Sequence, residues 1–298
     1  MLALIAVFVV AFFALWAGIY RVLPAAWRVS AAAWSRITRA ILRRQRFATW
    51  YERGAVRLHP LHPYRPLAVI LAVGFLTAAS TGAAFLGLAE LMQESSPRLG
   101  EIDHSVWQSS HRFRSPGATP FFIAFTLLGT ATGLGLLVLA SATFLALRGR
   151  YRWAAYLVVT ALGGWVLNQG LKLVFARARP DMAAALRHSS GYAFPSGHAM
   201  VSISVFGALV YLMVRGFSNW RVRSASAALA LCLTGAISLS RIYLGVHWFS
   251  DIAAGLSAGI VWLATTTGTY EVFRRMRMLR HTRAQQTRPE VRPESVQA

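Results

Sequence analysis

The chain has 298 residues, of which 56% are hydrophobic and only 14% are charged. A net charge of +21 would suggest nucleic-acid binding in a soluble protein, but these arginines lie between long apolar runs. Each run is near the roughly 20 residues that span a bilayer, so the arginines indicate membrane topology and anionic headgroups, with no nucleic-acid partner. The single cysteine, Cys232, excludes an internal disulfide and a zinc-finger type of metal site.

The first apolar run extends from Met1 to Tyr20 and is followed directly by Arg21. It lacks a basic n-region, so we predict an uncleaved anchor rather than a cleaved signal peptide. From Pro24 to Pro66, arginines alternate with tryptophans, which is typical of an amphipathic helix at the cytoplasmic interface. A specific lipid or partner-protein site is the alternative. Residues 1–66 are therefore predicted to be an anchor plus a basic interfacial segment.

Six further apolar runs complete a prediction of seven transmembrane helices, an all-α polytopic membrane bundle. The runs are Leu67–Ala89, Pro120–Leu147, Trp153–Phe175, Ala199–Val214, Ser224–Ser240 and Asp251–Phe273. A mixed-charge loop is expected after Ala89, and its aromatic residues His104, Trp107 and His111 could form a lid or an interfacial turn. The polar, basic tail 274–298 is predicted to be disordered.

Arginine distribution gives the orientation. The arginine-rich segments follow the first, third, fifth and seventh spans, so we expect them, and the C-terminus, to be cytoplasmic. The segments after the second, fourth and sixth spans are then extracytoplasmic. Two of these three segments carry the candidate functional residues, so the site is predicted to face the periplasmic or external side of the inner (cytoplasmic) membrane.

The segment after the fourth span is suited to phosphate binding. Lys172 is the only lysine of the chain, and an ammonium in an apolar run is costly unless it meets an anion. Arg177 and Arg179 add guanidinium groups that can bind phosphate through two hydrogen bonds. Ser196, Gly197 and His198 then open the next span, where free backbone N–H groups favour an anion.

The segment after the sixth span contains a possible nucleophile. His247 and Asp251 are four residues apart, so on a helix they share one face and the carboxylate can orient the imidazole. Arg241 brings a guanidinium to the side that is otherwise poor in arginine. Taken singly, either histidine could equally be an ordinary polar group at the membrane interface.

Three motifs occur in order: K-x6-R-P at Lys172–Pro180, P-S-G-H at Pro195–His198, and S-R-x5-H-x3-D at Ser240–Asp251. Together they resemble the signature of the type 2 phosphatidic acid phosphatase (PAP2) superfamily, which includes membrane lipid phosphatases, glucose-6-phosphatase and vanadium haloperoxidases. The resemblance covers roughly residues 67–273 and implies a six-helix PAP2 core. The first span and its basic segment lie outside this core.

The resemblance also implies roles for individual residues. His247 would take the phosphoryl group as a phosphohistidine, Asp251 would orient it, and His198 would protonate the leaving oxygen. Five residues would hold the phosphate: Lys172, Arg179, Ser196, Gly197 and Arg241. The superfamily uses no metal or other cofactor, and beside the motifs we find only the carboxylates Asp181 and Asp251. Arg177 lies outside the signature, so its contact with phosphate is open.

The expected function is hydrolysis of a lipid phosphate or diphosphate, such as phosphatidic acid, phosphatidylglycerol phosphate, an isoprenyl diphosphate or a lipid A phosphate. Its entrance would be lined by aromatic residues: Tyr192, Phe194, Tyr243, Trp248 and Phe249. A phosphotransferase using the same phosphohistidine is one alternative, and a non-catalytic binding or transport protein is another. The two histidines predict a bell-shaped pH profile. The oligomeric state stays open.

Overall fold

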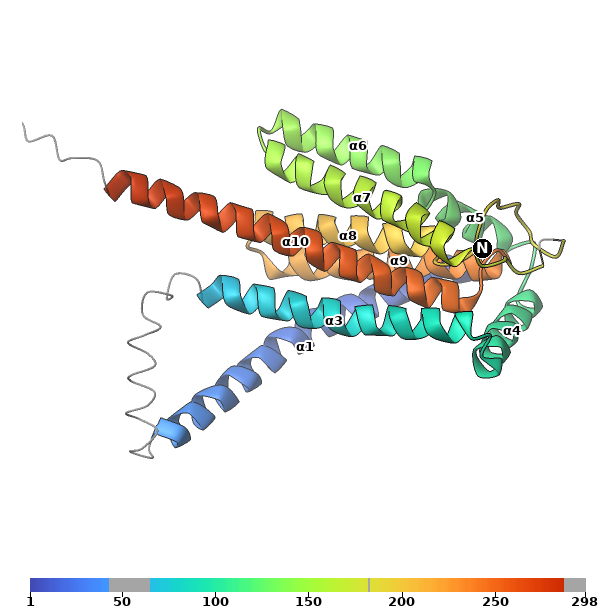
Figure 1. Ribbon diagram of the computed structural model, residues 1–298, viewed down its shortest axis with the longest axis horizontal. Coiled ribbons are helices and arrows are strands. Elements are labelled where there is room, and N and C mark those ends of the chain that lie inside the picture. Colours follow the sequence, from blue (N-terminus) through green and yellow to red (C-terminus); the bar gives the residue numbers. More distant parts are fainter. Residues whose placement is uncertain (43–64, 182, 287–298) are drawn as a thin grey trace, which may run out of the picture.

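The computed structural model describes residues 1–42, 65–181 and 183–286, and within this part all regular secondary structure is helical, with no strand. Its nine helices are α1 (Leu2–Leu42), α3 (Arg65–Gln93), α4 (Pro97–Arg112), α5 (Thr119–Leu128), α6 (Ala131–Leu147), α7 (Tyr151–Phe175), α8 (Gly197–Gly216), α9 (Trp220–Tyr243) and α10 (Phe249–Gln286) (Figure 1). Among these residues, six helices are long and apolar enough to span a membrane, or seven if α5 and α6 count as one span. The predicted all-α membrane bundle is confirmed.

The third predicted span is broken in the middle. Instead of one helix over Pro120–Leu147, the chain forms α5 and α6, which are bent by 52°. Thr130 caps α6, because its side chain accepts a hydrogen bond from the Gly133 N–H at 3.0 Å. A threonine cap after Gly129 competes with helix continuation, which is why apolar content alone predicted this region wrongly.

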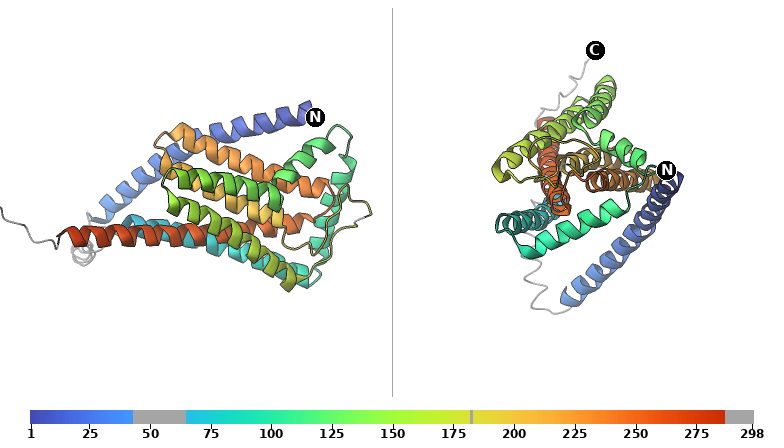
Figure 2. Two further views of the ribbon diagram at one scale, coloured as in Figure 1. Left: turned by 90° about the horizontal axis from the view of Figure 1, so that it is seen from above. Right: turned by 90° about the vertical axis from the view of Figure 1, so that its right-hand side faces the viewer.

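The predicted mixed-charge loop contains a helix, α4, which lies across one end of the bundle (Figures 1 and 2). Pro97 stands at its first turn, where its missing N–H costs nothing. Its buried residues are Leu99 and Asp103. The loop prediction failed here because the inward face contains a carboxylate where an apolar residue would have revealed the helical pattern.

The first and last helices are longer than predicted. The first helix continues through Pro24 to Leu42, so the segment after the first span begins as an extension of that span. At the other end α10 continues to Gln286, and disorder from residue 274 onward is wrong for 274–286. Arg274 and Arg275 lie one turn after Glu271 and pair with it, which supports the helix there. Residues 43–64 and 287–298 lie outside the described part.

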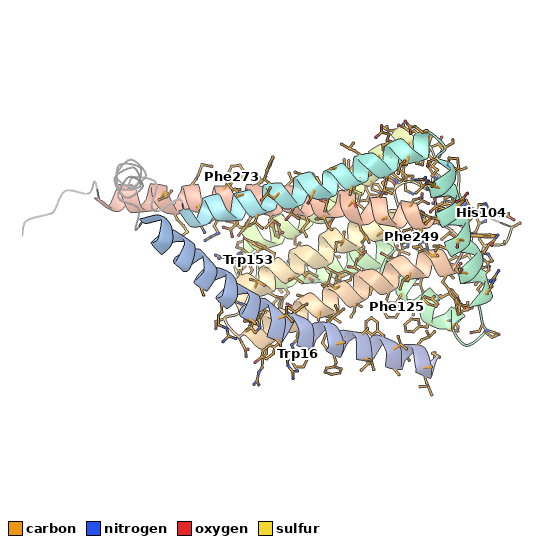
Figure 3. All side chains as sticks on the ribbon, turned by 90° about the horizontal axis from the view of Figure 1, so that it is seen from below. Trp16, His104, Phe125, Trp153, Phe249 and Phe273 are labelled. Carbon is orange, nitrogen blue, oxygen red and sulfur yellow. The ribbon has the colours of Figure 1, made fainter. Side chains whose placement is uncertain are left out.

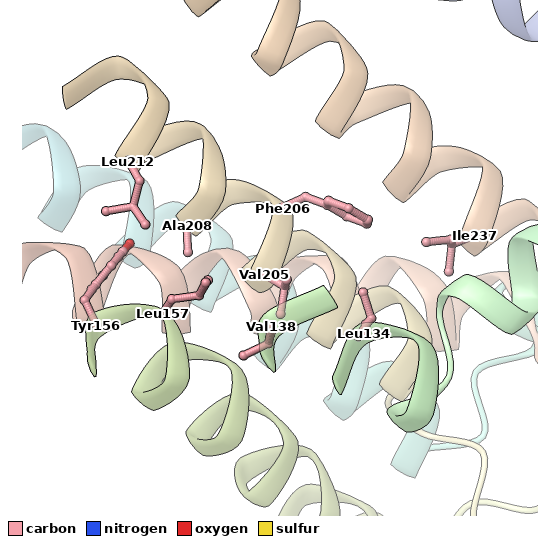
Figure 4. Packing of buried hydrophobic residues seen from close by; sticks show 9 residues of the cluster. All are labelled: Leu134, Val138, Tyr156, Leu157, Val205, Phe206, Ala208, Leu212 and Ile237. Carbon is pink, nitrogen blue, oxygen red and sulfur yellow. The ribbon is translucent and has the colours of Figure 1, made fainter. Parts of the chain in front are cut away.

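The helices form a bundle in which α8, α9 and α10 are central. Helix α10 packs on α3 and α8, while α9 packs on α8, α1 and α5 (Figures 1 and 2). The additional helix α1 lies along α9, and Trp16 donates a hydrogen bond to Ser224 Oγ at 3.0 Å (Figure 3). One core cluster joins α6, α7, α8 and α9: Leu134, Val138, Tyr156, Leu157, Val205, Phe206, Ala208, Leu212 and Ile237 (Figure 4).

Small residues let α10 approach the beginning of α8 closely. A Cβ atom at Gly255 would lie 2.6 Å from the Ser196 carbonyl oxygen, and one at Gly259 would lie 2.6 Å from that of Met200. Spans can pack this tightly only where side chains are absent. The contact fixes Ser196 and His198 beside the first turn of α10, which holds Asp251.

The two ends of the bundle differ in charge. One end gathers α4, the 176–196 loop and the α9–α10 turn, and the N-terminus of α1 lies there too (Figure 2). The opposite end carries a series of arginines at helix ends: Arg148, Arg150, Arg152, Arg215, Arg221, Arg223, Arg274 and Arg275. The segments after the second, fourth and sixth predicted spans therefore meet at one end.

Candidate active site

A tight turn places His247 between two spans. Helix α9 ends at Tyr243, and the Val246 N–H donates to the Arg241 carbonyl at 3.1 Å. Gly245 has a φ of +77°, a left-handed conformation that closes a helix end and favours glycine. A Cβ atom there would also meet the Arg114 guanidinium. The turn delivers His247 two residues before α10 begins.

His247 and Asp251 make the contact expected from their spacing. His247 Nδ1 lies 3.2 Å from Asp251 Oδ2, and the Trp248 N–H donates to the same oxygen at 2.9 Å. The two side chains are 2% and 0% exposed. Binding of Nδ1 to the carboxylate leaves the other ring nitrogen, Nε2, on the opposite side, where Arg179 Nη1 lies 3.2 Å away.

The surroundings of His247 keep its imidazole neutral. Burial has the largest effect, followed by the positive charges of Arg241, Arg179 and Lys172, and together they hold the pKa of His247 well below its ordinary value of 6.5. A neutral imidazole has a free electron pair on one nitrogen. With Nδ1 donating to Asp251, that pair is on Nε2.

All three predicted cations of the signature lie within electrostatic reach of His247. Lys172 Nζ donates to the Tyr192 carbonyl at 2.8 Å, and Arg179 Nε donates to that of Gly191 at 2.9 Å. Arg241 is 4% exposed and donates to Thr126 Oγ1 at 2.6 Å. Backbone carbonyls and a hydroxyl thus hold these cations in place with few counter-charges, which suits an anionic ligand.

Three buried polar atoms of predicted site residues have no hydrogen-bond partner among the described residues: Ser196 Oγ, His198 Nε2 and Arg241 Nε. His198 lies within electrostatic reach of Arg241, His247 and Lys172. Gly197 packs on Asn168, since a Cβ atom there would lie 2.7 Å from Asn168 Oδ1. Unpaired buried polar atoms cost free energy, so their gathering here indicates a place for ligand oxygens.

Two further groups complete the site: Arg177, whose role the sequence left open, and Asp103, which was not identified from the sequence. Arg177 donates to Asp251 Oδ1 at 2.7 Å and to Asp103 Oδ2 at 2.8 Å. Asp103 comes from α4 and is 2% exposed. In the sequence only Asp181 and Asp251 lie beside the motifs, and the fold adds Asp103 from a distant helix. Asp181 is exposed and accepts a hydrogen bond from the nearby Ala183 N–H.

A signal for Asp103 was present in the sequence. Leu99, Asp103, Val106 and Ser110 recur at helical spacing, and an acidic residue at the inward position of such a face needs a buried cation. That cation could not be identified from the sequence, because Arg177 lies 74 residues further along the chain.

The aromatic residues divide into buried and exposed groups. Phe194 is fully buried, with its ring 5.1 Å from that of Phe175, and Tyr243 is 5% exposed and stacks on Phe122 at 4.0 Å. These two do not line an entrance, contrary to expectation. Tyr192 and Phe249 are 42% and 44% exposed.

The aromatic face of α4 lies beside the site. The His104 ring is 5.5 Å from that of Trp248, and His104 and Phe249 lie at the same end of the bundle (Figure 3). Within the described part, no group of three histidine, cysteine, aspartate or glutamate side chains is placed to hold a metal ion.

Comparison with known proteins agrees with this geometry. Residues 152–275 match the model of the PAP2 superfamily. Phosphatidylglycerophosphatase B of Bacillus subtilis is 29% identical over 181 residues, which are 59% of this chain and 86% of the relative. Decaprenylphosphoryl-5-phosphoribose phosphatase of Mycobacterium tuberculosis is 32% identical over 183 residues, 56% of this chain and 89% of the relative.

The fold has a counterpart among solved structures. The crystal structure of a transmembrane PAP2 type phosphatidylglycerolphosphate phosphatase from Bacillus subtilis superposes with a TM-score of 0.60 at 26% identity, covering 65% of this chain and 96% of that one. The matched family region contains all three motifs and the His247–Asp251 pair. The chain belongs to the PAP2 superfamily and is a multi-pass membrane phosphatase, a phosphoric monoester or diphosphate hydrolase.

Proposed function

We propose that the protein hydrolyses a lipid phosphate or lipid diphosphate without a metal ion, through a phosphohistidine on His247, at the extracytoplasmic face of the inner membrane. One observation carries this proposal. Asp251 holds His247 Nδ1, so that the other ring nitrogen, Nε2, points to Arg179, and Lys172 and Arg241 lie within electrostatic reach of the same imidazole. A phosphoryl group placed there would meet an oriented nucleophile and a surplus of positive charge, which is what phosphoryl transfer requires.

In the first step the electron pair of His247 Nε2 forms a bond to phosphorus while the bond from phosphorus to the lipid oxygen breaks. His198, whose Nε2 has no partner within the described residues, is placed to give a proton to that leaving oxygen. In the second step His198 takes a proton from water, which attacks phosphorus and breaks the P–N bond. Inorganic phosphate leaves, and both histidines return to their starting states.

The remaining site residues would hold the phosphoryl oxygens. Lys172, Arg179 and Arg241 supply positive charge, and Ser196 Oγ and the Gly197 N–H add donors at the start of α8. Lys172 and Arg179 now donate to carbonyl groups of the 190–192 segment. We infer that substrate oxygens replace part of these contacts.

The place of the site in the bundle favours a lipid substrate. The site residues lie at the ends of α7, α8, α9 and α10, so a headgroup can enter while acyl chains stay beside the spans. The relatives named above act on phosphatidylglycerophosphate and on a decaprenylphosphoryl sugar phosphate. Phosphatidic acid, phosphatidylglycerol phosphate, an isoprenyl diphosphate and a lipid A phosphate form the substrate panel.

The experiment is phosphate release by the purified full-length protein from this panel, with EDTA present. We expect release from at least one lipid, and its loss in His247→Ala. His188→Ala is the matched control, because His188 is an exposed histidine of the same loop region. Release that needs a metal, or that persists in His247→Ala, would contradict the proposal.

Two further outcomes distinguish the alternatives. Phosphoryl transfer to an added acceptor lipid, with no phosphate released to water, would indicate the phosphotransferase. Binding of lipid phosphates with neither reaction would indicate a non-catalytic protein.

A further inference from the structure

Arg177 forms the centre of a buried ion network that reaches His247 from behind. One Arg177 nitrogen, Nη1, donates to Asp251 Oδ1 at 2.7 Å and to Ser250 Oγ at 2.7 Å. The other, Nη2, donates to Asp103 Oδ2 at 2.8 Å. The Ser250 N–H donates to Asp103 Oδ1 at 2.8 Å, so the first turn of α10 is also tied to α4.

In this network the two carboxylate oxygens of Asp251 bind different partners. Oδ1 takes the charge of Arg177, and Oδ2 faces His247 Nδ1 and the Trp248 N–H. Asp251 is 0% exposed, and Arg177 is the one arginine that forms an ion pair with it among the described residues. Removal of Arg177 would therefore leave a buried carboxylate without an arginine partner. A buried carboxylate in that state would draw closer to the histidine or take up a proton.

Arg177 does not need the phosphate to satisfy its hydrogen bonds. Both of its terminal nitrogens are occupied by carboxylates, whereas Lys172 and Arg179 donate to neutral carbonyl groups. The Arg177 guanidinium also lies 5.8 Å from the Trp248 ring centre. Its partners place it behind the Asp251–His247 pair, on the α4 side.

We propose that Arg177 and Asp103 are positioning residues for the phosphohistidine reaction: they fix Asp251, which in turn orients His247, and they make α4 part of the catalytic apparatus. This inference rests on the proposed function of His247. Helix α4 lies outside the three motifs. In this arrangement it nevertheless helps to fix the orientation of the His247 imidazole.

Several charged or titratable groups face His247 and Asp251, and the effect on the proton affinity of His247 follows from the signs of the charged ones. These groups are Asp103 on α4, Lys172 on α7, Arg177 and Arg179 after α7, His198 on α8 and Arg241 on α9. Removal of the Arg177 charge leaves Asp251 less neutralised, so the protonated form of His247 becomes more favourable. His247 must be neutral to attack, and the acid limb of activity then moves to higher pH.

The test compares Arg177→Ala, Asp103→Asn and the double variant Asp103→Asn/Arg177→Gln with wild type, on one lipid phosphate that wild type hydrolyses. The double variant removes both charges, so it leaves neither a buried carboxylate nor a guanidinium without its partner at these two positions. It replaces Arg177→Ala if that variant does not fold. We expect kcat to fall about 100-fold in Arg177→Ala, a typical effect of a misplaced reacting group, with KM unchanged. The titration of the substrate phosphate is the same for wild type and for every variant. A shift of the acid limb between them therefore reflects a changed pKa of a group on the enzyme.

Rescue distinguishes positioning from general stability. Guanidinium ions added to Arg177→Ala should restore part of kcat, and ammonium at equal ionic strength should not. Arg274→Ala is the matched control, because Arg274 binds the buried Glu271 at 2.8 Å at the far end of the bundle. It should keep wild-type kcat and pH profile.

Three results would overturn the inference: unchanged kcat and pH profile in both Arg177 variants, a rise in KM alone, or equal losses in Arg274→Ala. A rise in KM alone would instead make Arg177 a phosphate ligand. A failure of the proposed function is separately visible, because wild type would then release no phosphate or His247→Ala would stay active.

Discussion

The hydrogen-bond partners of its two ring nitrogens determine how His247 can react. His247 Nδ1 lies 3.2 Å from a carboxylate oxygen, and its other nitrogen lies 3.2 Å from Arg179. A carboxylate alone would raise the proton affinity of the imidazole, but burial and the nearby cations act more strongly in the opposite direction. The result is an oriented and neutral imidazole, which is what the proposed role of His247 as nucleophile requires.

The pH dependence follows from this balance. Since the pKa of His247 lies well below its ordinary 6.5, the nucleophile becomes protonated only in acid solution. We therefore expect the acid limb of kcat/KM from His247 below pH 6.5. A pH titration of phosphate release measures this limb, and a limb at or above pH 6.5 would contradict the assignment of His247.

At the scale of elements, two close helix contacts bring the motifs together. Gly255 and Gly259 of α10 lie against the backbone of α8, and Gly163 and Gly164 of α7 lie against Trp262 of α10. Each motif is at a helix end, so the relative axial position of these helices determines the distance between His198 and His247. Glycine is needed in the α8 contact because backbone atoms, which cannot move aside like side chains, occupy the space.

This contact can be tested by adding one methyl group. In Gly259→Ala the new Cβ would lie 2.6 Å from the Met200 carbonyl oxygen, so the helices must move apart. We expect a loss of about 1–3 kcal/mol in the free energy of unfolding, as for overpacked cores, and lower activity. The measurement is thermal unfolding in detergent.

Gly235→Ala is the matched control for that experiment. A Cβ atom at this position of α9 would have no atom within 4 Å, and alanine is the better helix former. The control should keep or raise the unfolding temperature. If both variants behave alike, the close contact between α8 and α10 does not limit stability.

The whole molecule has one end rich in helix-end arginines and one end with the candidate site. Of the described acidic residues, Glu271 alone lies at the arginine-rich end, whereas Glu90, Glu94, Glu101, Asp103, Asp181 and Asp251 lie near the site. Under the positive-inside rule we expect this asymmetry to place the site on the side away from the cytoplasm.

Cysteine labelling tests this orientation. Cys232 is 7% exposed, and Cys232→Ala provides a cysteine-free background. In that background, Ser190→Cys at the site end should react with a membrane-impermeant maleimide in spheroplasts. Ser218→Cys, in the loop between α8 and α9, should react only after lysis. The reverse pattern would place the site in the cytoplasm.

The sequence by itself determined the class of molecule and predicted most of the candidate site. Long apolar runs require helices in a membrane because only internal hydrogen bonding satisfies the backbone there, and this fixed the all-α bundle. Three motifs predicted roles for His247, Asp251, His198 and the cations from local spacing and residue chemistry alone. The break at Thr130 was less visible, since a capping hydroxyl is a weak signal inside an apolar run.

Only the tertiary structure decided which side chains support the site. Asp103, Arg177 and Asp251 are separated by 74 residues at each step, and no local pattern connects them. It also placed Phe194 and Tyr243 in the interior rather than at an entrance. Packing between distant helices makes these assignments, because a buried charge finds its partner through the fold and not through its neighbours in the chain.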